Sequence, residues 1–428
     1  MIYRSSVHSP TAFTQWLLPI LVLGVSLALA GCDQLLEVEP NPDTVPGEQI
    51  NNPTSLEARL VGAEADFFFS YDMAIVWGGL LTDELTNASN FIAIEERRPQ
   101  ADNGTIGAAD EAPEGFDGLW TPVQRAVAMT DLLQDDIQAD NFPDQVPNAT
   151  SSPELARMSL FAGYSKLILA DLFCSLAFGG TGPELTPAET YQRVIDEFTL
   201  AINAGDAAPE VLNAAYVGRA RAHLMLGNTS EALSDAQQVD PDFEFIGNAY
   251  STNSSREEND IWNMITDSQR FSVDPRYRSM TIDGTSTPDP RVVVFQDPDD
   301  QFAVDGSTPL FQAQKYIAPT APIRLASGFE ARYIIAEIEG GQTAVDIIND
   351  IRSELGIAET FASTDETEIL NKVLDERSRT LFLEGQRMSD LRRYLDQYGI
   401  DRFPTGPNIE DGTCFPLPNA ERDNNPDI

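Results

Sequence analysis

The first residue with an evident chemical role is Cys32, which ends the tetrapeptide Leu-Ala-Gly-Cys at residues 29–32. The preceding run, residues 16–30, carries no charge and is about as long as a signal-peptide core. It is too short to cross a hydrocarbon layer of roughly 30 Å comfortably as a helix. Small residues before a cysteine are typical of a bacterial lipoprotein signal, in which the thiol is acylated and the chain is cut before it. We therefore expect export and lipidation at Cys32, the alternative being an ordinary signal peptide.

The two remaining cysteines, Cys174 and Cys414, form an even pair in a chain that we expect to be exported. We expect a disulfide between them. It would close a loop of about 240 residues and contribute about 3–5 kcal/mol to stability if unstrained. The alternative is two independent buried thiols.

Side chains that support catalysis are scarce after the signal segment. His223 is the one histidine there, so neither a Ser-His-Asp site nor a zinc site is indicated. No Gly-rich phosphate loop of the Walker type occurs. The acidic run at residues 297–300 fails the EF-hand spacing, because Phe302 stands where the obligatory glycine belongs. Carboxylates are abundant enough for a two-carboxylate glycosidase, but no pair stands out. The sequence therefore predicts no metal or cofactor, and composition alone leaves a two-carboxylate glycosidase open.

Charge excludes one large class of partners. Removal of residues 1–31 from the 428-residue chain leaves 397 residues, enough for one large domain or two ordinary ones. The formal charge of −41 becomes −42, because the removed segment contains Arg4 and no acid. Such a surface repels phosphate backbones, so nucleic-acid binding is not expected. It also repels anionic lipid headgroups, which leaves the acyl chains to hold the protein at a membrane.

The elements that would position a binding site are mostly helices. Residues 32–55 are polar, acidic and proline-rich, and indicate a tether. Helical periodicity or helix start signals mark residues 119–137, 155–173, 186–202, 329–339, 343–355 and 366–382. The clearest hairpin spans residues 210–239 and resembles a tetratricopeptide unit, with Gly227 and Ala232 at the turn and second-helix positions. Residues from about 240 to 327 form a loop-rich insertion with short β-like runs. We predict an all-α fold of stacked hairpins with one irregular face.

The C-terminal third carries a family resemblance. Residues 372–394 have the sequence KVLDERSRTLFLEGQRMSDLRRY. This segment resembles the "ERxxELxFEGxRxxDLxR" signature of the SusD/RagB family of nutrient-binding outer-membrane lipoproteins. The matching positions are Glu376, Arg377, Glu384, Gly385, Arg387, Asp390, Leu391 and Arg393. Family motifs are also resembled, in the expected order, at residues 32–40, 116–126, 220–227, 329–337 and 415–421.

Three acid–base pairs with i,i+3 spacing fall within the signature: Glu376/Arg379, Glu384/Arg387 and Asp390/Arg393. This spacing allows ion pairs on the surface of a helix. We expect them to belong to the scaffold rather than to a ligand site, and, with the break at Gly385, to fix how two terminal helices meet.

The resemblance implies a lipid-anchored protein of the cell outer membrane, exposed at the surface. It would form a mostly helical SusD-like lid over a TonB-dependent, SusC-like transporter and pass a glycan or oligopeptide to it without catalysing a reaction. The chain would then comprise a signal peptide (residues 1–31), a lipid-anchored tether (32–55) and a SusD/RagB-like domain (56–428).

The ligand-binding candidates are the rings of Trp77, Trp262 and Tyr277, which lie near loop-rich stretches. Aromatic side chains are more often part of a core, which is the competing interpretation for each. Two other functions remain open from the sequence. One is a periplasmic scaffold lipoprotein with a tetratricopeptide-like groove for partner proteins, and the other is a surface glycoside hydrolase.

Overall fold

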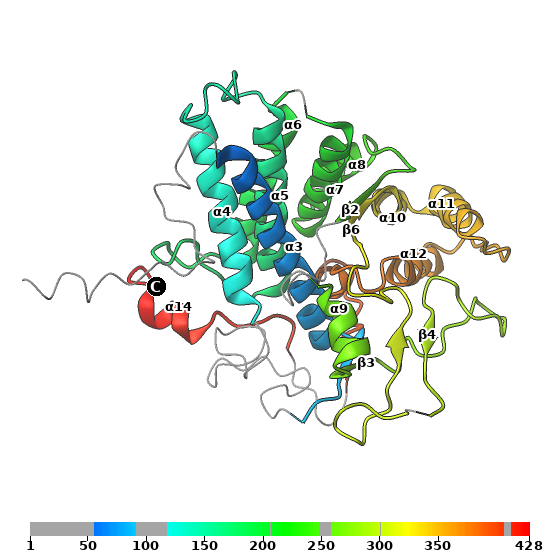
Figure 1. Cartoon of the computed structure of the whole chain (residues 1–428). Helices are drawn as coiled ribbons and strands as arrows, with labels where there is room; N and C mark the ends of the chain where they lie inside the picture. Colours follow the sequence, from blue (N-terminus) through cyan, green and yellow to red (C-terminus); the bar gives the residue numbers. More distant parts are fainter. Residues whose placement is uncertain (1–54, 91–117, 206, 248–257, 300, 406–411) are drawn as a thin grey trace, which may run out of the picture. The chain divides into compact units, whose positions relative to one another are not determined.

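The computed structural model describes residues 55–90, 118–205, 207–247, 258–299, 301–405 and 412–428. Cys32 and most of the expected tether lie outside these ranges. Residues 56–428 form one compact unit in which helices carry most of the core (Figure 1). The predicted all-α class is confirmed, because the strands are few and short. No helix in the described ranges combines the length and the hydropathy needed to cross a membrane.

The N-terminal part of the unit is a stack of helices, each packed on its neighbours along the chain. They are α3 (Leu56–Leu81), α4 (Trp120–Gln138), α5 (Pro153–Leu172), α6 (Pro187–Asn203), α7 (Pro209–Met225) and α8 (Thr229–Ala236). Helix α5 contacts α3, α4, α6 and α7. It is therefore buried along most of its length, as its almost continuous apolar sequence predicts.

Local sequence sets the starts of these helices. The Ser152 side chain accepts the Leu155 N–H at 3.1 Å, and Pro153 occupies the first turn of α5. At α6, Thr186 and Glu189 form a reciprocal capping box. Helix α6 begins at its predicted cap, whereas α5 begins at Pro153, two residues before the predicted start at residue 155. In both helices these side chains satisfy backbone N–H groups that the helix itself leaves unpaired.

The predicted hairpin at residues 210–239 is formed by α7 and α8. Gly227 lies between them at φ +74°, a left-handed conformation that glycine adopts without strain. In α7, a Cβ atom added at Gly218 would lie 2.2 Å from the ring of Phe198 in α6. Only glycine at this position lets the two helices approach so closely.

The insertion is held by short antiparallel strand pairs. Strand β1 (Leu85–Asn87) pairs with β3 (Phe271–Val273), β2 (Glu244–Gly247) with β6 (Ile323–Ser327), and β4 (Val294–Phe295) with β5 (Gln312–Ala313). Helix α9 (Asp260–Trp262) continues into a π-helical turn, η3 (Asn263–Asp267), and packs on α3. The β2–β6 pair joins the two ends of the insertion to the helical frame.

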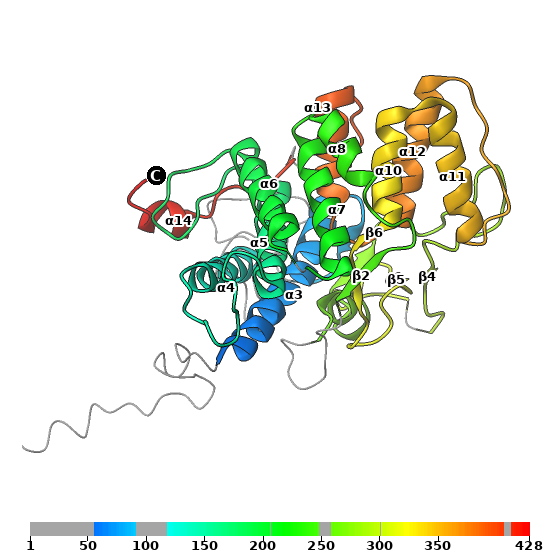
Figure 2. The same cartoon turned by 90° about the horizontal axis from the view of Figure 1, so that it is seen from above.

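The C-terminal part contains α10 (Gly328–Glu339), α11 (Gly341–Glu354), α12 (Glu366–Thr380), α13 (Arg387–Tyr398) and α14 (Asn419–Asn424). Figure 2 shows α10, α11 and α12 side by side, next to α7 and α8. The sequence analysis did not delimit α13. Its buried residues include the charged Arg387, Asp390 and Arg393 beside the apolar Met388 and Leu391. Gly385 at φ +76° separates α12 from α13.

The C-terminal segment is linked to the end of α5 by a disulfide and by backbone hydrogen bonds. Cys174 and Cys414 are joined by a disulfide, with their Cα atoms 5.1 Å apart. Beside it, the Phe415 N–H donates to the Leu172 carbonyl at 2.7 Å and the Cys174 N–H donates to the Phe415 carbonyl at 2.8 Å. The covalent bond and the backbone hydrogen bonds hold the same two segments together.

Candidate functional site

An open pocket of about 1150 Å³ lies against α12. One wall comes from the insertion, another from the segment between α11 and α12, and a third from the segment after α13. The lining residues are Arg276, Asp283, Phe361, Asp365, Thr367, Glu368, Asn371, Lys372, Asp375 and Arg402. All but Phe361 carry side-chain hydrogen-bonding groups, so the pocket is suited to a polar ligand.

Helix α12 supplies one face of this pocket. Its lining residues Glu368, Asn371, Lys372 and Asp375 follow one another at spacings of three, one and three, which places them on one side of a helix. Asp365 caps the helix by accepting the Glu368 N–H at 2.9 Å. The helix start is thereby fixed, and with it the direction of the polar side chains.

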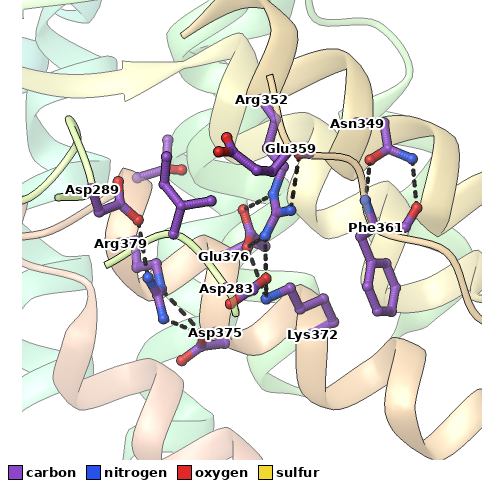
Figure 3. A network of polar contacts seen from close by, with 12 residues as sticks. Asp283, Asp289, Asn349, Arg352, Glu359, Phe361, Lys372, Asp375, Glu376 and Arg379 are labelled. Atoms are coloured by element: carbon purple, nitrogen blue, oxygen red, sulfur yellow. Dashed lines mark hydrogen bonds and ion pairs between the residues drawn. The ribbon is translucent and has the colours of Figure 1, made fainter. Parts of the chain in front are cut away.

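The ring of Phe361 is held in place by Asn349 of α11. The Asn349 Oδ1 accepts the Phe361 N–H at 2.7 Å, and the Asn349 Nδ2 donates to the Phe361 carbonyl at 2.8 Å (Figure 3). The Lys372 Nζ lies 5.8 Å from the ring centre. These contacts pre-order the ring, which lowers the entropy that a ligand must overcome on binding.

Beneath the pocket lies a buried ion-pair network centred on Glu376 (Figure 3). Arg352 and Arg291 both donate to its carboxylate, Arg291 Nη1 at 2.6 Å. Arg352 also reaches Asp283 at 2.5 Å, and Lys372 contacts the same carboxylate. Burial opposes ionisation of Glu376, but the hydrogen bonds and charge of its arginine partners outweigh it and lower its pKa. The network fixes the insertion against α11 and α12.

A second carboxylate of the insertion, Asp289, contributes to the same network. It accepts from Arg291 at 2.7 Å and from Arg379 of α12 at 3.0 Å. Burial raises its pKa, but the hydrogen bonds from these two arginines lower it to about 2. Arg379 also bonds Asp375 at 3.0 Å (Figure 3), so the lining carboxylate of Asp375 is itself neutralised.

The signature residues pair differently from the sequence expectation. Of the three predicted i,i+3 pairs, only Asp390/Arg393 forms, at 2.9 Å. The other residues pair mainly between elements: Glu376 with Arg352 and Arg291, Arg379 with Asp289, Glu384 with Lys315 and Arg324, and Arg387 with Asp83. Within α12, Arg379 also forms an i,i+4 pair with Asp375. The prediction of surface pairs was wrong because most of these side chains face the protein interior, where long-range partners satisfy them. Their structural role is supported by this burial.

The signature also lies within the region that matches a known protein family. A model of the SusD family matches residues 330–428, which include α10 to α14 and most of the pocket lining. The fold is shared with a SusD-like carbohydrate-binding protein from Bacteroides vulgatus ATCC 8482, with a TM-score of 0.62 and 14% identity, over 88% of this chain and 97% of that chain. This chain has the SusD fold. The predicted resemblance to the SusD/RagB family is confirmed.

Two further solved structures show the same fold. Surface glycan-binding protein A from Bacteroides uniformis has a TM-score of 0.60 and 15% identity, over 88% of this chain and 99% of that chain. The corresponding protein from Bacteroides thetaiotaomicron, in complex with laminarihexaose, has a TM-score of 0.59 and 14% identity, over 86% and 97%. No curated protein matches the sequence of this SusD-like chain.

The SusD-like fold places the three candidate rings outside the pocket. The Trp77 side chain in α3 is 1% exposed, and Tyr277 is fully buried against Phe382 at a centroid distance of 4.5 Å. Trp262 is half-buried and packs on the core. The expected exposure of Trp77 and Tyr277 was therefore wrong. Neighbouring elements surround α3 in this region, and Tyr277 covers the turn between α12 and α13.

The sequence analysis missed the exposed rings of the insertion. Phe295 is 46% exposed and Phe302 is 50% exposed. Exposed apolar side chains also occur nearby in sequence at Val293, Val304 and Ile317. A usable signal was present, since Phe295 ends a short β-like run bordered by proline and aspartate. Phenylalanine, however, carries no polar group that would suggest a ligand contact.

Proposed function

We propose that this SusD-like protein binds an oligosaccharide and delivers it to a TonB-dependent, SusC-like transporter in the outer membrane. The observation that carries the proposal is the open, polar pocket on a fold shared with a protein solved in complex with laminarihexaose. The fold similarity covers almost the whole length of that protein. Capture and release, rather than bond cleavage, is the proposed activity.

The chemistry of the pocket supports a sugar ligand. Hydroxyl groups both donate and accept hydrogen bonds, and the lining offers carboxylates, an amide and guanidinium groups. Phe361 supplies one apolar surface on which the carbon face of a sugar ring can pack. The exposed rings of Phe295 and Phe302 on the insertion would give a long ligand further apolar contacts.

The anchor belongs to the proposal as well. Lipidation at Cys32, which lies outside the described residues, would tether the protein to the outer membrane through residues 32–55. We expect Cys32→Ser to release the protein into the soluble fraction. Wild-type protein solubilised from membranes should co-purify with a β-barrel transporter. Co-purification with envelope-assembly proteins instead would favour the scaffold alternative.

Calorimetric titration tests the binding function. Wild-type protein, Phe361→Ala and the control Leu132→Ala are titrated with laminarihexaose and other oligosaccharides. Leu132 is 51% exposed on α4, away from the pocket lining. Loss of the ring contact should weaken binding by about tenfold, since such contacts are worth about 0.5–1.5 kcal/mol beyond buried area. Equal affinities of Phe361→Ala and wild type would remove this pocket from the proposal, and cleavage of a ligand would favour the hydrolase.

A further inference from the structure

Arg402 differs from the other cations of the pocket in its partners. Its Nη2 donates to the Asn371 side-chain oxygen at 2.7 Å and to the Asn371 carbonyl at 3.4 Å. Its Cζ also lies 6.0 Å from the centre of the Tyr394 ring, and among the described residues Arg402 makes no ion pair with a carboxylate. Neither Nε nor Nη1 of Arg402 has a hydrogen-bond partner in these ranges. A half-buried guanidinium thus lines the pocket with most of its donors unused.

The two other cations that line the pocket form ion pairs within the protein. Lys372 contacts the carboxylate of Asp283 and lies 3.3 Å from that of Glu376. Arg276 lies 3.3 Å from Asp83 and 3.6 Å from Asp375. Of the three lining cations, Arg402 is therefore the one that makes no ion pair in the described part of the chain.

Burial also distinguishes Arg402 from the arginines beneath the pocket. Burial lowers the pKa of Arg402 despite the opposing effects of Tyr394 and of the Asp375 charge, and the charges of Arg387 and Arg276 add smaller decreases. Arg352 and Arg379 have raised pKa values instead, because carboxylates offset the cost of their burial.

We propose that Arg402 binds a carboxylate of the ligand, so that the preferred ligand is an acidic oligosaccharide containing uronic acid residues. The inference rests on the proposed function and names its substrate class. A guanidinium offers parallel N–H donors that match the two oxygens of a carboxylate, an arrangement that a neutral sugar hydroxyl cannot fill. A ligand acid would give Arg402 the carboxylate partner that it lacks among the described residues.

The acidic residues and Arg402 lie at different ends of the pocket. Asp365 and Glu368 are exposed at the start of α12, while Arg402 binds Asn371 farther along the helix. The carboxylates of Asp365 and Glu368, at the start of α12, would repel a second carboxylate of the ligand. The pocket therefore suits a ligand whose acidic sugar lies at the Arg402 end, with neutral hydroxyl groups facing Asp365 and Glu368.

Matched ligands test this inference without any change to the protein. Hexamers of galacturonate and of mannuronate are each compared with their carboxyl-reduced, neutral counterparts and with laminarihexaose by calorimetric titration. We expect at least one acidic hexamer to bind about tenfold more tightly than its reduced counterpart, the size of one charge-assisted hydrogen-bonding contact. This preference should weaken as salt concentration rises.

Variants then assign the preference to Arg402. Arg402→Gln should abolish the preference for the acidic hexamer, because it should weaken binding of the acidic hexamer by a larger factor than binding of the reduced one, and Arg402→Lys should retain part of the preference. Arg422→Gln, at an exposed arginine outside the pocket lining, is the charge-matched control. Tighter binding of neutral ligands, or an acid preference unaffected in Arg402→Gln, overturns this inference and leaves the proposed function standing. Failure of all the oligosaccharides to bind overturns both.

Discussion

Arg387 of α13 donates two hydrogen bonds, each of 2.7 Å, to the carboxylate of Asp83, which lies 304 residues earlier in the chain. Both side chains are almost fully buried. The pair therefore joins the C-terminal signature to the segment that follows α3. Arg387 of the signature therefore makes a tertiary contact and does not lie on the exposed surface of α13.

The first prediction concerns this pair. Asp83→Asn would leave the Arg387 guanidinium buried without its carboxylate, so we expect the free energy of unfolding to fall by about 3–5 kcal/mol. Glu354→Gln is the control, because Glu354 is 43% exposed and pairs with Arg332. An exposed pair of this kind is worth about 0–1 kcal/mol. Urea unfolding measures the free energy of unfolding of both variants. Similar losses in the two would contradict the expected difference between a buried and an exposed ion pair.

A second prediction concerns the support of Phe361. Asn349→Ala removes both hydrogen bonds to the Phe361 backbone, so we expect a loss of about 1–3 kcal/mol in stability. Ligand affinity should also fall, because the ring must then be ordered on binding. Asn349→Asp keeps an acceptor for the Phe361 N–H and loses the donor to its carbonyl, so its effect should be intermediate. Unchanged affinity in Asn349→Ala would show that the ring does not need this support.

A third prediction concerns the disulfide. Mass spectrometry of non-reduced peptides should find Cys174 linked to Cys414. A Cys174→Ser, Cys414→Ser double variant should lose about 3–5 kcal/mol in free energy of unfolding, because the open chain gains conformational freedom when unfolded. Reduction of wild-type protein should reproduce this loss and leave the variant unaffected. Two free thiols in freshly purified protein would be the contrary outcome.

The fourth prediction concerns pH and Glu84. Burial raises the pKa of Glu84 to about 7, although the Leu383 N–H and the charge of Arg387 oppose this shift. The folded state therefore holds the proton more tightly than the unfolded chain. Below about pH 4.5 both states are protonated and Glu84 has no effect on pH dependence. As pH rises from there to about 7, the unfolded state loses its proton first and stability falls by about 3 kcal/mol.

Glu84→Gln isolates this contribution. The variant keeps a side-chain oxygen to accept the Leu383 N–H and cannot ionise. We expect its stability relative to wild type to increase between about pH 4.5 and 7 and to remain level above that. Urea unfolding across this pH range measures the difference. A difference that does not vary with pH would show that Glu84 is ionised in the folded protein.

Amphipathic helices with capping side chains were predictable from the sequence. Helix α6 begins at its predicted cap, and its buried residues recur at helical spacing. Helix α3 was not delimited, because every residue from Phe67 to Leu81 is buried and no polar face gives the segment a period. Such a helix is determined by the elements that surround it.

The candidate site was predictable only in part. The signature residues were located, but their partners lie on other elements, and sequence spacing cannot identify a partner such as Arg291 for Glu376. Ring exposure could not be predicted from residue type, because Trp77 is buried while Phe295 is not. The pocket combines side chains from three separate segments, so no single motif contains it.

Pairing of β2 with β6 brings the two ends of the loop-rich insertion together at one place on the helical frame. Between these ends, Arg291 donates to Glu376 of α12, and Asp283 accepts from Arg352 of α11. Variation of the insertion is therefore constrained at these two positions, because their replacement would remove partners from buried charges of the frame.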